Sequence, residues 1–193
     1  MANFLIGYLN NIRPLSDALK ADLERYLDIV ELPRHHMLLR EGQRCDYIYV
    51  VISGLLRMYY IKESEEVCSR FVAEEQMCLS VNSFYTRVPG YEYIETLEAS
   101  TIARIHHDNL EKVYAEHSEF NLTGRLITQL YFIRSEERLY LLRKQTAEDR
   151  YQTFVDNNPG LLQRVPLKYI ASYLGLTLET ISRIRKKKSM AGR

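Results

Sequence analysis

One face of the segment 178–188 combines an acid, a hydroxyl and an arginine with a run of lysines. In the major groove of DNA, arginine donates to the edge of guanine and glutamate accepts from the amino group of cytosine. If the segment is helical, these side chains project outward together. We therefore predict that four residues read the bases of a duplex: Leu178, Glu179, Ser182 and Arg183.

Cationic and hydroxyl side chains around that face suit the phosphates of DNA. The residues predicted to contact phosphates are Lys168, Thr177, Thr180, Lys186 and Lys187. Residues 161–193 contain eight Lys and Arg against one acid, a net charge of +7, whereas the rest, with 18 basic and 24 acidic residues, carries −6. This asymmetry favours binding of a polyanion by one end. The alternative is a solvated basic tail behind an ordinary helical hairpin.

Two short helices joined by a tight turn must position these side chains. Pro166 suits the first turn of a helix, where its missing N–H costs nothing. Gly175 takes the left-handed conformation that ends a helix, and Thr177 is a good N-cap for the next one. Apolar residues on the two helices are spaced to face each other. These are Ile170, Leu174, Ile181 and Ile184. The segment therefore predicts a helix-turn-helix.

The composition is typical of a folded chain, with 193 residues of which 46% are apolar. No apolar run approaches the roughly 20 residues of a membrane helix, and the first residues do not resemble a secretion signal. Three cysteines without a CxxC pair indicate reduced thiols. We therefore expect a cytoplasmic protein with no membrane partner.

Upstream, the apolar spacing predicts a helix over residues 12–31, followed by short strands up to residue 105. Residues 47–52 and 55–61 are rich in β-branched and aromatic side chains and flank a Ser-Gly turn, which predicts a hairpin. A second strand pair is predicted at 93–97 and 101–105. Several short strands at this spacing indicate a barrel or a sandwich.

A long helix is predicted over residues 116–144. Its residues Leu126, Leu130, Ile133 and Tyr140 form a seam that resembles that of a coiled coil. Because the helix is longer than a small domain needs, we expect it to pair with a second copy. The alternative is a core helix that lies on the barrel.

The order of a strand-rich domain, a long helix and a helix-turn-helix resembles the Crp/Fnr family of bacterial transcription regulators. Residues 38–60 resemble the first half of the family's cyclic-nucleotide-binding β-roll, through Leu-Leu-Arg-Glu-Gly, Asp-Tyr-Ile-Tyr and Ser-Gly-Leu-Leu-Arg-Met-Tyr-Tyr. Residues 165–188 resemble its DNA-reading unit, whose base-contacting glutamate and arginine match Glu179 and Arg183. The sequence is most similar to the branch found in Bacteroidetes-type bacteria.

The resemblance implies an α+β fold with three parts and flanking helices. A β-roll of the jelly-roll type (a double-stranded β-helix) would span residues 1–115, a dimerisation helix 116–144, and a helix-turn-helix domain 145–193. The implied function is a homodimeric, DNA-binding transcription regulator. Relatives often continue into a β-hairpin wing that this sequence lacks, so residues 185–188 would supply phosphate contacts instead. The alternative is a ligand-binding or protein-interaction module whose truncated helix-turn-helix no longer reads DNA.

Members of the family that bind cyclic nucleotides carry Gly-Glu-x-Gly followed by Arg-Ser or Arg-Thr. The corresponding residues 77–93 have no Gly-Glu-x-Gly, and Gly90-Tyr91 falls near the expected Arg-Ser. A buried phosphate without an arginine is poorly stabilised, so cyclic AMP is expected to bind weakly or not at all. Residues expected near an effector pocket of unknown ligand are Tyr59, Ser80, Asn82, Arg87, Tyr93 and Tyr131.

No metal or other cofactor is predicted. Cys45, Cys68 and Cys78 are spread through the β region, whereas the family's iron–sulfur members need an N-terminal cluster. The adjacent histidines at 35–36 and 106–107 would point to opposite faces of a strand, so neither pair chelates a metal. An enzyme is not predicted either, because the sequence shows no Ser/His/Asp set, phosphate-binding glycine loop or supported acid pair.

Overall fold

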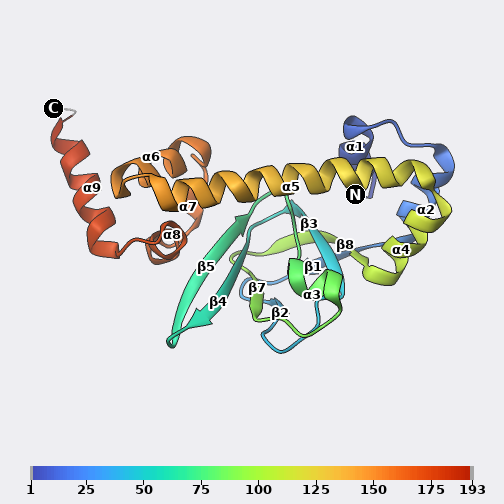
Figure 1. Cartoon of the computed structure of the whole chain (residues 1–193), viewed down its shortest axis with the longest axis horizontal. Coiled ribbons are helices and arrows are strands. Elements are labelled where there is room, and N and C mark those ends of the chain that lie inside the picture. The colour runs from blue at the N-terminus through green and yellow to red at the C-terminus, as the bar shows by residue number, and fades with distance from the viewer. Residues whose placement is uncertain (1, 192–193) are drawn as a thin grey trace.

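Two antiparallel sheets, a long helix and a C-terminal group of helices make up the protein (Figure 1). The computed structural model describes residues 2–191, apart from the side chains of 2–4, 8, 144 and 188–191. The arrangement confirms the predicted α+β class, with a β-roll flanked by helices. No described helix is long and apolar enough to cross a membrane.

Each sheet of the roll has four strands. The first sheet, in spatial order, consists of β1 (Leu27–Leu32), β8 (Ser100–His106), β3 (Tyr47–Ser53) and β6 (Met77–Cys78). The second consists of β2 (Met37–Leu39), β7 (Glu92–Thr96), β4 (Leu56–Lys62) and β5 (Glu65–Val72). Strands that follow one another along the chain therefore often lie in different sheets.

The two predicted strand pairs are wrong for this reason. Strand β3 pairs with β8 and β6, whereas β4 pairs with β5 and β7. The chain passes between the sheets at Gly54, whose φ of +104° is open to glycine alone, and a Cβ there would collide with Ser100. The Ser-Gly signal marks a crossing and not a hairpin. The hairpin is β4–β5, which turns at Glu63 and Ser64 with positive φ.

The predicted helix over residues 12–31 is confirmed only in its middle, over Asp17–Tyr26, and is wrong at both ends. The structure has α1 (Ala2–Ile12), a break, α2 (Asp17–Tyr26) and then strand β1. Ser16 caps α2 by accepting from the backbone N–H of Leu19. Leucines at helical spacing continue into β1, but pairing with the whole of β8 overrides that local periodicity.

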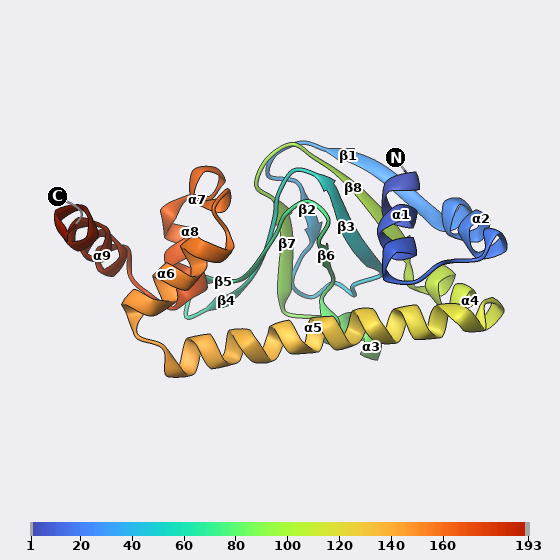
Figure 2. The same cartoon turned by 90° about the horizontal axis from the view of Figure 1, so that it is seen from above.

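Helices connect the roll to the C-terminal end. After α3 (Val81–Thr86) and α4 (His107–Glu116), helix α5 (Ser118–Lys144) extends for 27 residues along one side of the molecule (Figure 2). The remaining helices are α6 (Ala147–Asn157), α7 (Leu161–Arg164), α8 (Leu167–Leu174) and α9 (Leu178–Ala191). The predicted long helix is confirmed, with His117 separating α4 from α5.

Two apolar clusters hold these parts together. The larger joins the roll to α1, α2, α4 and the first turns of α5. The smaller combines roll residues such as Leu55 and Phe71 with side chains of α6, α8 and α9 such as Phe154, Leu174 and Ile181. The second cluster fixes the C-terminal helices on the β4–β5 side of the roll.

Replacement of Gly54 tests the crossing. We expect Gly54→Ala to destabilise the fold by about 2 kcal/mol or more, because it adds backbone strain and a clash with Ser100. Urea unfolding measures the change. Gly160→Ala is the matched control, since Gly160 has φ −76° and open space around it, and it should be neutral or slightly stabilising. Equal effects of the two substitutions would contradict this role of Gly54.

Candidate nucleic-acid interface and effector site

The turn between α8 and α9 has the geometry that the sequence predicts. Gly175 adopts φ 62° and ψ 41°, the left-handed conformation, and ends α8. Thr177 caps α9, because its Oγ1 accepts a hydrogen bond of 3.1 Å from the backbone N–H of Thr180. Ile181 and Ile184 of α9 are buried, as expected for a helix that packs on its neighbours.

The opposite face of α9 is exposed and projects from one end of the molecule (Figure 1). All four residues predicted to read bases lie on it: Leu178, Glu179, Ser182 and Arg183. Of the residues predicted to contact phosphates, Lys168, Thr177, Lys186 and Lys187 are exposed and Thr180 is half-buried. Lys187 forms an ion pair of 3.1 Å with Glu148 of α6.

Polar contacts fix α8 on the β4–β5 hairpin. Ser172 donates to the carbonyl of Glu66 and accepts from the backbone N–H of Cys68, each at 2.9 Å. Arg57, only 2% exposed, lies 3.8 Å from the ring centroid of Tyr169 on α8. Helix α8, on which α9 packs, is thus held at a defined place relative to the roll.

Arg57 is neutralised within the roll. Its guanidinium forms ion pairs of 2.6 Å with Glu95 and with Glu66 and stacks on Tyr59 at 4.1 Å. Neither this residue nor its carboxylate partners carried a functional signal in the sequence, because the two partners come from two other strands, β5 and β7.

A second set of contacts links α7 to the crossing between the sheets. Arg164 donates to the carbonyl of Gly54 at 2.9 Å and to Glu74 at 2.8 Å, and it also pairs with Glu98. The hydrogen bond from Arg164 lowers the pKa of Glu74 from its ordinary 4.5 to about 2. Arg164 was not singled out from the sequence, where it counts only as one cation of the basic end.

Helix α5 exposes large apolar side chains beyond the part that packs on the roll. The exposed residues are Leu130, Phe132, Ile133, Leu139 and Tyr140. Three members of the predicted seam, Leu130, Ile133 and Tyr140, are among them, and Leu126 is half-buried. Five large apolar side chains on one exposed helix form a surface suited to a partner.

The residues predicted for the effector pocket fall into separate sets of contacts. Tyr59 stacks on Tyr93, with ring centroids 4.7 Å apart, and the hydroxyl of Tyr93 donates to Glu41 at 3.2 Å. Arg70 lies over the ring of Tyr131 at 4.6 Å. Tyr59 and Tyr93 therefore contact each other, whereas Tyr131 contacts Arg70.

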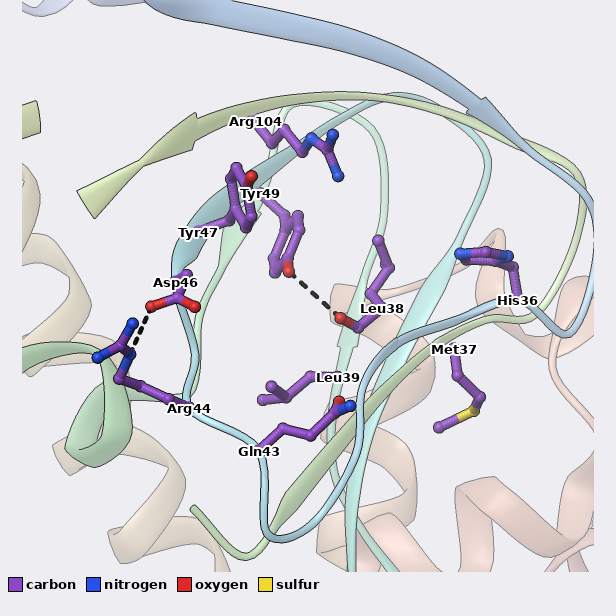
Figure 3. A pocket seen from close by; sticks show the side chains of 10 residues that line it. All are labelled: His36, Met37, Leu38, Leu39, Gln43, Arg44, Asp46, Tyr47, Tyr49 and Arg104. Atoms are coloured by element: carbon purple, nitrogen blue, oxygen red, sulfur yellow. Dashed lines mark hydrogen bonds and ion pairs between the residues drawn. The ribbon is translucent and has the colours of Figure 1, made fainter. Parts of the chain in front are cut away.

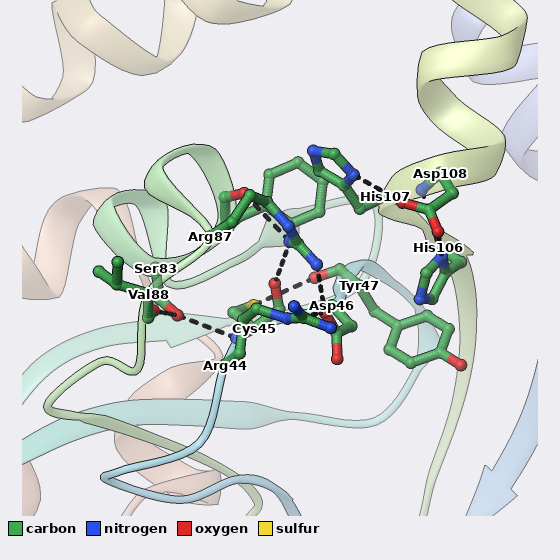
Figure 4. A network of polar contacts seen from close by, with 11 residues as sticks. Arg44, Cys45, Asp46, Tyr47, Ser83, Arg87, Val88, His106, His107 and Asp108 are labelled. Carbon is green, nitrogen blue, oxygen red and sulfur yellow. Dashed lines mark hydrogen bonds and ion pairs between the residues drawn. The ribbon is translucent and has the colours of Figure 1, made fainter.

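The other three predicted pocket residues lie in or beside α3. Buried Ser80 donates to Glu92 at 2.5 Å, and burial raises the pKa of the Glu92 carboxyl. Asn82 is exposed. Arg87 pairs with Asp46 and donates to the carbonyl of Cys45 at 2.9 Å, so its guanidinium points toward the start of β3 (Figure 4).

A cavity of about 470 Å³ lies elsewhere in the roll, between β2 on one side and β3 and β8 on the other (Figure 3). Its polar lining includes His36, Arg44, Asp46 and Arg104, and its walls include the rings of Tyr47 and Tyr49 and residues 37–39. Sequence reasoning missed this site, because its lining residues come from distant segments. A smaller, apolar cavity of about 90 Å³ lies between the first sheet and helices α1, α4 and α5.

Asp46 joins that cavity to α3. It accepts a hydrogen bond of 2.7 Å from Arg44 and pairs with Arg87, which ends α3 in a left-handed conformation. Burial alone would raise the pKa of Asp46, but the bonds from the two arginines outweigh it and lower the pKa. Asp46 is therefore ionised at neutral pH.

Metal chemistry finds little support among the described residues. The three cysteines are buried, and burial raises the pKa of Cys68 and of Cys78 to about 12, so both are neutral thiols. Asp22, Glu116 and His117 bring ligand atoms within 4.8 Å of one another. Because His117 Nε2 already contacts Asp22 at 2.8 Å, we assign this group the role of tying α2 to the start of α5.

Residues 29–117 match the model of the cyclic nucleotide-binding domain. The anaerobic regulatory protein of Haemophilus influenzae is 24% identical over 183 residues, which cover 84% of this chain and 69% of the relative. FnrA of Stutzerimonas stutzeri, a transcriptional activator, is 26% identical over 185 residues, covering 84% and 72%. FixK2 from Bradyrhizobium japonicum has the same fold, with a TM-score of 0.75, 19% identity and 86% of each chain covered.

In sequence and in fold, the chain is similar to regulators of the Crp/Fnr family. A solved structure described as a Crp/Fnr regulator, from Eubacterium rectale, superposes with a TM-score of 0.73 at 17% identity, covering 94% of this chain and 89% of the other. Two of these relatives, FnrA and Anr of Pseudomonas protegens, are transcriptional activators. The narrower assignment to the Bacteroidetes-type branch stays a prediction.

The ion pair between Arg164 and Glu74 predicts an acid response of the fold. Because the pKa of Glu74 is lowered on folding, the pair stabilises the protein above pH 4.5, and this contribution is lost as the pH falls toward 2. Arg164→Met should lower the free energy of unfolding at neutral pH by about 1 kcal/mol, the scale of partly exposed ion pairs. It should also flatten the pH dependence in that window, measured by urea unfolding.

Arg13→Met is the control, since Arg13 is exposed at the end of α1, far from this contact along the chain. A variant at Arg164 that keeps the full acid dependence of the natural protein would contradict the assignment.

Proposed function

We propose that the protein is a homodimeric transcription regulator that binds duplex DNA through two copies of α9. The observation that carries the proposal is the division of α9 into a buried face, with Ile181 and Ile184, and an exposed face, with Glu179 and Arg183. An exposed arginine on a capped helix that follows a short turn has the chemistry for reading guanine. As the domain boundaries we propose those of the sequence prediction, residues 1–115, 116–144 and 145–193.

Dimerisation through α5 supplies the second recognition helix. The apolar side chains of Leu130 and Ile133 lie on the part of α5 between the roll and the C-terminal helices, about half exposed. Pairing of two α5 helices would cover this surface and place two α9 helices on half-sites about one helical turn, some 34 Å, apart. A cytoplasmic location follows from this role.

Cyclic AMP is not the ligand that the α3 region favours. A Cβ at Gly90, which falls near the position expected for the family's Arg-Ser, would lie 3.0 Å from the Cβ of Ser83 and 3.2 Å from Ser80 Oγ. The backbone is therefore closed against α3 where a phosphate-binding side chain would need space. Glu92 follows in the sequence and is hydrogen-bonded to Ser80, so a phosphate would meet a carboxyl group there. Effector control, if the regulator has it, uses another ligand.

Arg183 provides the test of base reading. Arg183→Ala should weaken binding to a duplex selected from a random library by about 1–3 kcal/mol and leave binding to random DNA unchanged. Lys186→Ala is the matched control on the same helix, and it should weaken both duplexes alike through a lost phosphate contact. Fluorescence anisotropy at fixed salt measures both. Equal losses for Arg183→Ala on the two duplexes would show that it reads no base, and no binding at all would favour a module that has lost DNA recognition.

A charge on the exposed seam tests the dimer. Ile133→Glu should raise the dimer dissociation constant at least about a hundredfold, because an ionised carboxylate would be buried without a partner. Sedimentation velocity over a range of concentrations measures it. Ile61→Glu places the same charge on an exposed apolar position of the β4–β5 hairpin and should leave the dimer intact. A natural protein that stays monomeric at high concentration would contradict the proposal.

A further inference from the structure

The cavity between β2 and the first sheet has the size and lining of a ligand site. Its volume of about 470 Å³ lies within the roughly 300–1,000 Å³ typical of small-molecule pockets. It opens between the edge of the second sheet and the inner face of the first, where Tyr47, Tyr49 and Arg104 lie (Figure 3). The region around Ser80 and Gly90, where the family's nucleotide would lie, contributes no residue to its lining.

Charge defines the class of ligand. Arg44 and Arg104 line the cavity, and the one carboxylate of its lining, Asp46, already accepts from Arg44 and from Arg87. The positive charge therefore exceeds the negative charge around the cavity. A group that enters it gains most if it carries a negative charge.

Arg104 is the best-placed partner for such a group. Its Nε is buried and makes no hydrogen bond, and its nearest acid, Asp28, is 3.5 Å away in a loose ion pair. The Cζ atom of its guanidinium lies over the ring of Tyr47, 4.6 Å from the ring centroid, and this contact helps to position it. An oriented guanidinium with unused donors is suited to the two oxygens of a carboxylate.

The apolar part of the lining requires an apolar body on the ligand. Met37, Leu38 and Leu39 form one wall, and the rings of Tyr47 and Tyr49 form the other. The hydroxyl of Tyr49 donates to the carbonyl of Leu38 at 3.3 Å and closes the inner end. A small carboxylate with an aromatic or compact aliphatic body satisfies both halves of the lining.

The geometry points to this cavity as the binding site of a small organic carboxylate, held by Arg104 and by Arg44. The site is also placed to act on the dimer helix. Asp46 connects it to Arg87 at the end of α3, and Tyr85 of α3 lines the same small apolar cavity as Thr128 of α5. This regulatory role rests on the proposed function, whereas carboxylate binding does not depend on it.

Benzoate is the probe, and benzyl alcohol is its neutral match in size and shape. Isothermal titration of the full chain, without DNA, should show saturable binding of benzoate and at least about tenfold weaker binding of the alcohol, because the alcohol cannot form the charge-assisted bonds. Arg104→Gln should weaken benzoate binding about tenfold. Arg13→Gln, which removes an exposed arginine from the end of α1, should leave it unchanged.

A second variant keeps the test decisive if Arg104→Gln does not fold. Met37→Trp fills the cavity without changing its charge and should abolish benzoate binding, with folding checked by circular dichroism. Absence of saturable binding, equal binding of benzoate and benzyl alcohol, or unchanged binding by a folded Arg104 variant overturns the inference. A protein that binds duplex DNA but not benzoate loses this site and keeps its proposed function. A protein that binds benzoate but not duplex DNA keeps this ligand site and loses its proposed function.

Discussion

The arrangement of the whole molecule depends on one buried charge. Arg57 is almost fully removed from solvent, so its guanidinium must be paired or the fold would lose several kcal/mol. Glu95 and Glu66 supply the opposite charge, and the rings of Tyr59 and Tyr169 lie 4.1 Å and 3.8 Å from the guanidinium carbon. Because Tyr169 belongs to α8, the enclosure of Arg57 is complete only when the C-terminal helices lie on the roll. The same docking is completed by the apolar cluster around Phe71 and Phe154.

Local signals gave the C-terminal end correctly. Gly175 ends α8 and Thr177 caps α9 through contacts with residues a few positions away. The burial of Ile181 and Ile184 follows from their spacing on the same helix. The length of α5 was predicted for the same reason. These are the parts of the fold where a residue's neighbours in the sequence are also its neighbours in space.

The sequence predicted that this region forms a β-roll, but it did not predict which strands pair with each other. Gly54 has the same local sequence signal whether the chain turns back or crosses to the other sheet, and the two cases differ only in which distant strands pair with β3 and with β4. Residues 27–32 have a leucine spacing that suits a helix, yet they form a strand because their backbone pairs with β8. The cavity was missed because His36, Asp46 and Arg104 come together only once both sheets have formed.

The unbroken course of α5 makes it a lever between the two ends of the protein. At about 1.5 Å per residue, its 27 residues span about 40 Å. A tilt of only about 5° about its first turn, where Phe120 is buried against the roll, would displace its far end by about 3.5 Å, roughly the rise of one base pair in DNA. In a dimer in which two α5 helices pair near their middle, the same tilt of each helix would move their C-terminal ends in opposite directions. The distance between the two α9 helices of the dimer would then change in response to tilts of α5 that are too small to alter the roll itself.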